Sequence, residues 1–252
     1  MFMPKAVIFD CYNTLLYYRS EEEKDGIWEM MVTAVEYMTE KPLTITPEEL
    51  ETLYKEEFQK EAEECEKQRG THAEICMRRI WQNVMIHLQI PRELAKEKAE
   101  DILLVYRLYT RKRKYLFPNV KKELMALKEH GMKLLLLSNA QTCFLYNELP
   151  EEIRDLFDVL LISEVIGIKK PDENAFRLAF ERLGTEPEHI VFVGDSAEDD
   201  MIPAGRLGCH CIMIGKLNRK DSRLAHVHAF DPHRESGYEG LTEMIVSLDK
   251  DM

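Results

Sequence analysis

Residues 5–16, KAVIFDCYNTLL, begin with a short apolar run that ends at Asp10. A run of this length, rich in β-branched residues, is typical of a parallel strand that is buried on both faces. In open sheets of parallel strands, ligands bind beyond the carboxyl ends of the strands. The segment therefore predicts a buried first strand and makes Asp10, at its end, the first candidate for chemistry.

Similar apolar runs recur in the second half of the chain, with amphipathic segments between them. Two of these segments, residues 120–130 and 173–183, are followed by Gly131 and Gly184, as helices commonly are. Because strand and helix alternate, we expect an α/β fold, a Rossmann-like parallel sheet with right-handed crossovers. The further predicted strands are Met132–Leu137, Val159–Ile162, His189–Val193 and Cys209–Ile214.

The chain from residue 21 to about residue 112 lacks strand-like runs, and apolar and charged residues alternate there at helical spacing. Thr46 followed by Pro47 predicts a capped helix start, and Pro91 predicts another. We expect an all-helical inserted domain. The predicted division is 1–18 and 113–252 for the α/β core and 19–112 for the helical domain.

Composition narrows the functional classes. The 252 residues are 45% hydrophobic and carry a formal charge of −12, which repels nucleic acid and anionic membranes on average. A small anionic substrate would need a local cluster of cations. The six cysteines form no CxxC pair, and the amino terminus has no signal-peptide pattern, so we expect a cytoplasmic protein with reduced thiols, as a monomer or a homodimer.

Polar residues of the types that catalyse reactions lie at the ends of three predicted strands and in one later loop. Taken singly, each has an ordinary structural explanation: a turn aspartate, a helix cap, a solvated lysine, or acids at a helix start. Their order on successive strand ends favours a shared site. The four groups are Asp10 to Thr14, Ser138-Asn139, Lys170-Pro171 and Asp195 to Asp200.

The same four segments resemble the motifs of the haloacid-dehalogenase-like hydrolases, in the same order. FDCYNTL is similar to the first motif of that family, LLLLSNA to the second, GIKKPDENAF to the third and IVFVGDSAEDDMIPAG to the fourth. The resemblance covers the whole chain, since the helical insertion matches the family's cap domain.

The resemblance implies a role for each residue. Asp10 would be the nucleophile that forms a covalent intermediate. Ser138 and Asn139 would bind substrate oxygens, and Lys170 would neutralise the negative charge that gathers as the substrate approaches Asp10.

It also implies a Mg²⁺ ion. The ligands would be the carboxylates of Asp10 and Asp195 and the backbone carbonyl of Tyr12, all of them oxygen donors. Asp199 or Asp200 would hold Lys170 or a metal-bound water, and Asp200 fits the family spacing better. Thr14 would support the site.

Tyr12 departs from the pattern of most phosphatases in the family, which have a second aspartate there. That aspartate acts as general acid and base, and such help is typically worth about 10² to 10⁴ in rate. Tyrosine at this position resembles the 2-haloacid dehalogenases, which need neither that acid nor a metal. Because Asp195 and Asp200 would be costly to bury without a cation, we expect a Mg²⁺-dependent phosphatase acting on a small phosphate ester, with 2-haloacid dehalogenation as the alternative.

A third possibility is a vestigial enzyme whose helical domain binds another protein. Substrate choice in this family depends on the cap, where several arginines and aromatic residues are candidates. Each could equally be solvated, paired with an acid or part of the cap core. These candidates are Arg78, Arg79, Trp81, Tyr106, Arg107, Tyr109 and Arg111.

Overall fold

A six-stranded sheet forms the centre of the larger part of the molecule. The computed structural model describes residues 4–248, and the order of the strands across the sheet is β5-β4-β1-β6-β7-β8, all parallel. The predicted Rossmann-like α/β core is therefore confirmed. The strands are β1 Ala6–Phe9, β4 Lys133–Ser138, β5 Val159–Ile162, β6 Ile190–Gly194, β7 His210–Ile214 and β8 His228–Phe230.

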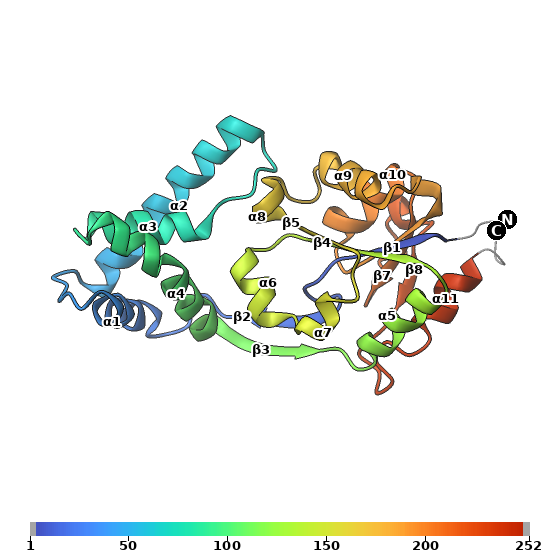
Figure 1. Cartoon of the computed structure of the whole chain (residues 1–252), viewed down its shortest axis with the longest axis horizontal. Helices are drawn as coiled ribbons and strands as arrows, with labels where there is room; N and C mark the ends of the chain where they lie inside the picture. Colours follow the sequence, from blue (N-terminus) through green and yellow to red (C-terminus); the bar gives the residue numbers. More distant parts are fainter. Residues whose placement is uncertain (1–3, 249–252) are drawn as a thin grey trace.

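Helices cover both faces of this sheet, which is why its central strands are mostly apolar (Figure 1). Ala6 and Ile8 of β1 belong to one apolar cluster, with residues of α9 and α10, while Val7 and Phe9 belong to another, with residues of α5 and α11. The helices of the core are α5 Val120–Glu129, α6 Thr142–Glu148, α7 Glu151–Arg154, α8 Ser163–Ile166, α9 Glu173–Leu183, α10 Ile202–Arg206 and α11 Leu241–Ser247. Short turns of other helix types are η1 Pro187–His189, η2 Ala197–Met201 and η3 Ser222–Leu224.

The insertion is helical, as expected, and lies beside the core (Figure 1). Its helices are α1 Ile27–Thr39, α2 Pro47–Arg69, α3 Met77–His87 and α4 Arg92–Thr110. Helix α2 begins with the predicted cap, because the Thr46 side chain accepts a hydrogen bond from Glu49 N and the Glu49 carboxylate accepts one from Thr46 N. Trp81 is fully buried among apolar residues of all four helices, so it is a core residue of the insertion.

A two-stranded antiparallel ribbon joins the insertion to the core (Figure 1). It consists of β2 Leu16–Ser20 and β3 Arg111–Leu116, neither of which was expected as a strand. The sequence of β3, RKRKYL, has no apolar pattern because the ribbon is only partly buried. The predicted domain boundaries, at residues 18 and 113, fall within this ribbon, and the division of the chain there remains a prediction.

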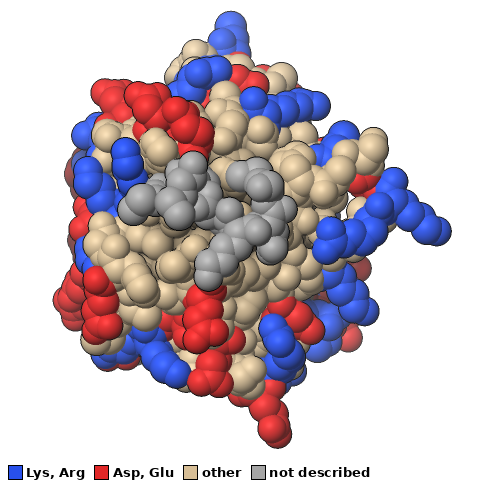
Figure 2. Space-filling model, turned by 90° about the vertical axis from the view of Figure 1, so that its right-hand side faces the viewer, with Lys and Arg blue, Asp and Glu red and all other residues tan. Residues whose placement is uncertain are grey.

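Several surface properties complete the description. On the face at the end of the core remote from the insertion, acidic and basic side chains are intermixed (Figure 2). Within residues 4–248 we find no helix long and apolar enough to cross a membrane. All six cysteines carry free thiols, as expected.

Candidate active site

The ends of β1 and β6 and the loop after α8 bring three charged side chains into contact. Lys170 Nζ lies 2.7 Å from Asp10 Oδ1 and 2.6 Å from Asp200 Oδ1. All three side chains are buried, with exposed fractions of 7% for Asp10, 3% for Lys170 and 1% for Asp200. Segments far apart in the sequence thus converge on one buried charged cluster.

Burial and the neighbouring acids have opposite effects on the pKa of Lys170. Burial lowers its pKa, but Asp10 and Asp200 raise it, and the pKa of Lys170 lies above its usual value. The lysine is therefore a cation at neutral pH, fixed between two carboxylates. Thr14 Oγ1 donates to the other oxygen of Asp10 at 3.1 Å, so both Asp10 oxygens accept hydrogen bonds.

Asp195 and Asp200 follow β6. Gly194, at the end of this strand, has no side chain and lets the Asp200 carboxylate pack against its backbone. A Cβ atom on Gly194 would lie 2.4 Å from Asp200 Oδ2. Asp200 Oδ2 accepts from Ser196 N at 3.0 Å, which fixes the carboxylate within the η2 turn. Of the two acids proposed to hold Lys170, it is Asp200 that contacts it, while Asp199 is partly exposed and its backbone N donates to Ser196.

The three carboxylates Asp10, Asp195 and Asp200 could hold a metal ion. One oxygen from each lies within 4.8 Å of the other two. Burial, together with the charges of Asp10 and Asp200, raises the pKa of Asp195 to about 7. Three acids against one lysine leave an excess of negative charge, and the donors are all oxygens. The cluster therefore fits a hard divalent cation.

The second strand end, after β4, carries Ser138 and Asn139, the two residues that the resemblance implied as ligands of substrate oxygens. Ser138 Oγ is buried and has no hydrogen-bond partner among residues 4–248, which leaves it available to a ligand. The Asn139 side chain instead binds the backbone of Lys170, since its Nδ2 donates to Lys170 O at 2.9 Å and its Oδ1 accepts from Lys170 N at 2.8 Å. Asn139 thus fixes the lysine in place.

Tyr12 is part of a second charged cluster, between the core and the insertion. Its hydroxyl donates to Glu148 Oε2 at 2.7 Å, and Arg107 of α4 binds both oxygens of Glu148 at 3.0 Å. The Arg107 guanidinium also lies 3.5 Å from the centre of the Tyr18 ring. Glu148 is only 4% exposed. Burial raises the pKa of the Tyr12 phenol, and Glu148 adds to the rise.

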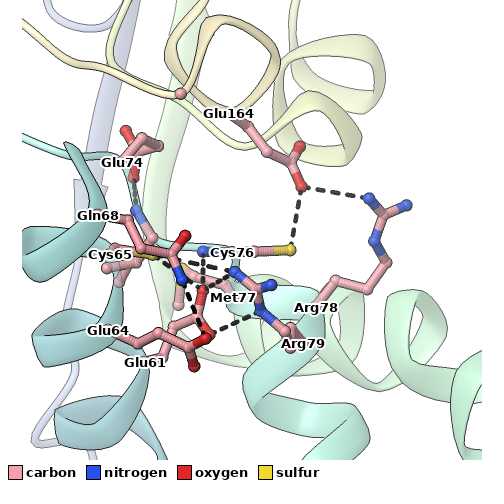
Figure 3. A network of polar contacts seen from close by, with 12 residues as sticks. Glu61, Glu64, Cys65, Gln68, Glu74, Cys76, Met77, Arg78, Arg79 and Glu164 are labelled. Carbon is pink, nitrogen blue, oxygen red and sulfur yellow. Dashed lines mark hydrogen bonds and ion pairs between the residues drawn. The ribbon is translucent and has the colours of Figure 1, made fainter.

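Two other arginines proposed for substrate choice are paired with acids. Arg79 binds Glu61 through two nitrogens, at 2.7 and 2.6 Å. Arg78 reaches across from the insertion to Glu164 of α8, which also accepts from the Cys76 thiol (Figure 3). These side chains therefore stabilise the insertion and its contact with the core.

The loop between α2 and α3 lies against the segment that leads to the lysine. Lys169 N donates to His72 O at 2.9 Å, and Glu74 N donates to Gly167 O at 3.0 Å. The neighbour of Lys170 is thus fixed by the insertion as well as by Asn139.

Glu148 is the residue of this region that sequence reasoning missed. It lies on α6 and meets Tyr12 across 136 positions of the chain. An acid at the end of an amphipathic helix normally faces solvent, and no spacing in the sequence distinguishes it. Its role follows only from the packing of α4 against α6.

Comparisons with known proteins find similarity over most of the chain. A family model described as haloacid dehalogenase-like hydrolase matches residues 4–208. The glyceraldehyde 3-phosphate phosphatase of Methanopyrus kandleri is 31% identical over 224 residues, 87% of each chain. The enzyme of the same name from Methanocaldococcus jannaschii is 29% identical over 136 residues, 54% of this chain and 58% of that protein's length.

A solved structure gives a similar fold. The 2-haloacid dehalogenase from Pseudomonas syringae pv. Tomato DC3000 superposes with a TM-score of 0.66, covering 96% of this chain and 98% of the other, at 22% identity. At 22% identity the similarity establishes the fold alone, and the chemistry has to be argued from the residues of the site.

Proposed function

This chain belongs to the haloacid dehalogenase-like hydrolase family, and we propose that it is a metal-dependent phosphatase acting on a small phosphate ester. The observation that carries the proposal is the cluster of Asp10, Asp195 and Asp200, whose oxygens lie within 4.8 Å of one another. A displacement of halide from carbon needs no third acid beside Asp10 and Asp200. A dianionic phosphate, in contrast, needs a cation beside Asp10 before it can approach.

In this mechanism Asp10 attacks phosphorus and forms an aspartyl phosphate, which water then hydrolyses. Lys170 lies 2.7 Å from Asp10 and would reduce the repulsion between the nucleophile and the phosphate oxygens. The unpartnered Ser138 hydroxyl would donate to one of those oxygens. Asp200 and Asn139 keep Lys170 in position.

We propose Mg²⁺ as the cation, held by Asp10, Asp195 and the backbone carbonyl of Tyr12. When bound, it would neutralise charge on the transferring phosphoryl group. The relatives named above act on glyceraldehyde 3-phosphate according to their names, and a small phosphate ester of this kind is the proposed substrate class here.

Dehalogenation of a 2-haloacid is the second candidate, because Tyr12 occupies the place of the usual acid and base. The two activities separate in one experiment that measures phosphate release from 4-nitrophenyl phosphate and halide release from 2-chloropropionate, each with Mg²⁺ and with EDTA. Phosphate release that requires Mg²⁺ supports the proposal. Halide release that is indifferent to EDTA, without phosphate release, overturns it, and the absence of both would favour a binding protein.

A further inference from the structure

The loop between α2 and α3, residues 70–76, lies along the segment of the core that leads to Lys170. Ala73 pairs with Ile168 in an isolated antiparallel bridge. The two backbone hydrogen bonds given above lie on either side of this bridge. The insertion thus holds one of the two core loops that the proposed reaction needs.

Glu74 reaches from the same loop of the insertion to the other core loop, the one after β4. Ser163 Oγ donates to Glu74 Oε2 at 2.5 Å and accepts from Ala140 N at 2.8 Å. The one hydroxyl hydrogen is directed at Glu74, because its other acceptor, Ala140 O, lies farther away at 3.3 Å. Ala140 follows Ser138 and Asn139 directly in the sequence. Glu74 therefore acts on these two residues through one intermediate side chain.

Gln141 reaches in the opposite direction, from the core into the insertion. Its Nε2 donates to Ile75 O at 3.0 Å and to Glu74 Oε1 at 3.4 Å, and its Oε1 accepts from Met77 N at 3.0 Å. Met77 is the first residue of α3, whose cap residue Cys76 makes no side-chain hydrogen bond to the helix start. Gln141 is only 4% exposed. The two loops thus satisfy each other's polar groups at a buried junction.

The Glu74 carboxylate is the common acceptor at this junction. Besides Ser163 and Gln141, the backbone N of Ile75 donates to it, at 3.1 Å. A carboxylate only accepts hydrogen bonds, so it suits three donors, whereas a side-chain amide would turn an NH₂ group toward one of them. Removal of the carboxylate would leave the Ser163 hydroxyl without its nearer acceptor.

From these contacts we infer that Glu74 is a positioning residue: from the insertion, it fixes the loop that carries Ser138 relative to the segment that carries Lys170. The inference rests on the proposed function, in which Ser138 donates to the same phosphate whose charge Lys170 offsets. Among residues 4–248, the hydrogen bonds of the Glu74 side chain reach none of the groups that would meet the substrate, so its effect passes through Ser163 and Gln141. A displacement of about 1 Å in such a site can cost about 10²-fold in rate.

The test measures kcat for 4-nitrophenyl phosphate with Mg²⁺ in Glu74→Ala, in Ser163→Ala and in the double variant. Each single change should reduce kcat by about 10- to 10²-fold. Because both side chains belong to one chain of hydrogen bonds, the double variant should lose no more than the single ones. Glu57→Ala is the matched control, since Glu57 is a buried acid of α2 whose ion pair, with Lys60, lies within the insertion. It should keep the native kcat.

A second measurement does not depend on turnover. Hydrogen exchange of the Ala140 amide, followed by NMR, reports on its hydrogen bond to Ser163. In Glu74→Ala the exchange rate of this amide should rise by about tenfold or more, whereas Glu57→Ala should leave it unchanged. If Glu74→Ala does not fold, Glu74→Gln, which keeps the shape of the side chain, takes its place in both measurements.

The outcomes separate the inference from the proposed function. Native kcat in Glu74→Ala would overturn the inference and leave the phosphatase proposal standing, and so would an equal loss of kcat in Glu57→Ala. Losses that multiply in the double variant would show that Glu74 does not act through Ser163. If the native chain releases no phosphate, the phosphatase proposal fails, and the exchange rate of Ala140 still decides whether Glu74 fixes this loop.

Discussion

Lys170 Nζ lies 2.7 Å from Asp10 Oδ1, in a site where both side chains are buried. A second carboxylate, from Asp200, lies 2.6 Å from the same nitrogen. The lysine therefore holds together two acids that would otherwise repel each other. It also orients the proposed nucleophile before a substrate enters.

Replacing Lys170 by Gln should reduce kcat by at least about 10²-fold and destabilise the fold, because two buried carboxylates lose their partner. Removal of one member of a buried ion pair typically costs about 3 to 5 kcal/mol. Urea unfolding and phosphatase assays measure the two effects. Lys169→Gln is the control, since the neighbouring side chain takes no part in the cluster, and a Lys170→Gln variant with native activity would refute the assignment.

Replacing Gly194 by Ala should impair the site without adding or removing a charge. The new methyl group would lie 2.4 Å from Asp200 Oδ2, so the Asp200 carboxylate, which binds Lys170, must shift. We expect a loss of stability of about 1 to 3 kcal/mol, as for other overpacked positions, together with reduced kcat. Thermal unfolding combined with kinetics checks this, and unchanged values for both would show that Asp200 need not stay in place.

Replacing Glu148 by Gln should leave the partly buried Arg107 without its charged partner. The expected loss is about 3 to 5 kcal/mol of unfolding free energy, measured by urea titration. A double-mutant cycle with Arg107→Met isolates the interaction between the two side chains. The exposed pair Lys121 and Glu152, 2.6 Å apart, is the comparison, and its coupling should be below about 1 kcal/mol. Equal coupling in the two cycles would contradict a structural role for the buried pair.

Mg²⁺ should stabilise the folded chain, which gives a test that does not depend on turnover. A ligand at 100 times its Kd stabilises by about 2.7 kcal/mol, visible as a rise in Tm. Asp195→Asn should abolish that rise, whereas Asp155→Asn, at an exposed position, should preserve it. A rise in Tm that survives Asp195→Asn would place the ion elsewhere.

Much of the core could be predicted because its strands are buried on both faces and carry a continuous apolar pattern. The runs ending near Asp10 and Gly194 were expected within a residue of their observed ends. The edge strand β8, three residues long, and the charged strand β3 gave no such signal. Their pairing depends on neighbours that the local sequence does not specify.

Only part of the site, likewise, could be predicted from the sequence. Asp10 could be proposed from its place at a strand end, since such ends meet at one edge of a sheet, whereas Lys170 and Asp200 were proposed from the resemblance of their segments to the family motifs. The hydrogen bonds of Asn139 to Lys170 and of Tyr12 to Glu148 could not, because both depend on how loops and helices pack. The sequence therefore indicated which residues gather but not which of them bind one another.

The most direct test of the central claim is whether Asp10 becomes phosphorylated during turnover. Acid quenching of the native chain with 4-nitrophenyl phosphate and Mg²⁺, followed by peptide mass spectrometry, should find a phosphoryl group on the peptide that contains Asp10. Asp10→Asn should show neither the phosphopeptide nor turnover, while Asp155→Asn shows both. Steady phosphate release by Asp10→Asn would contradict the account, and the nucleophile would have to be sought elsewhere.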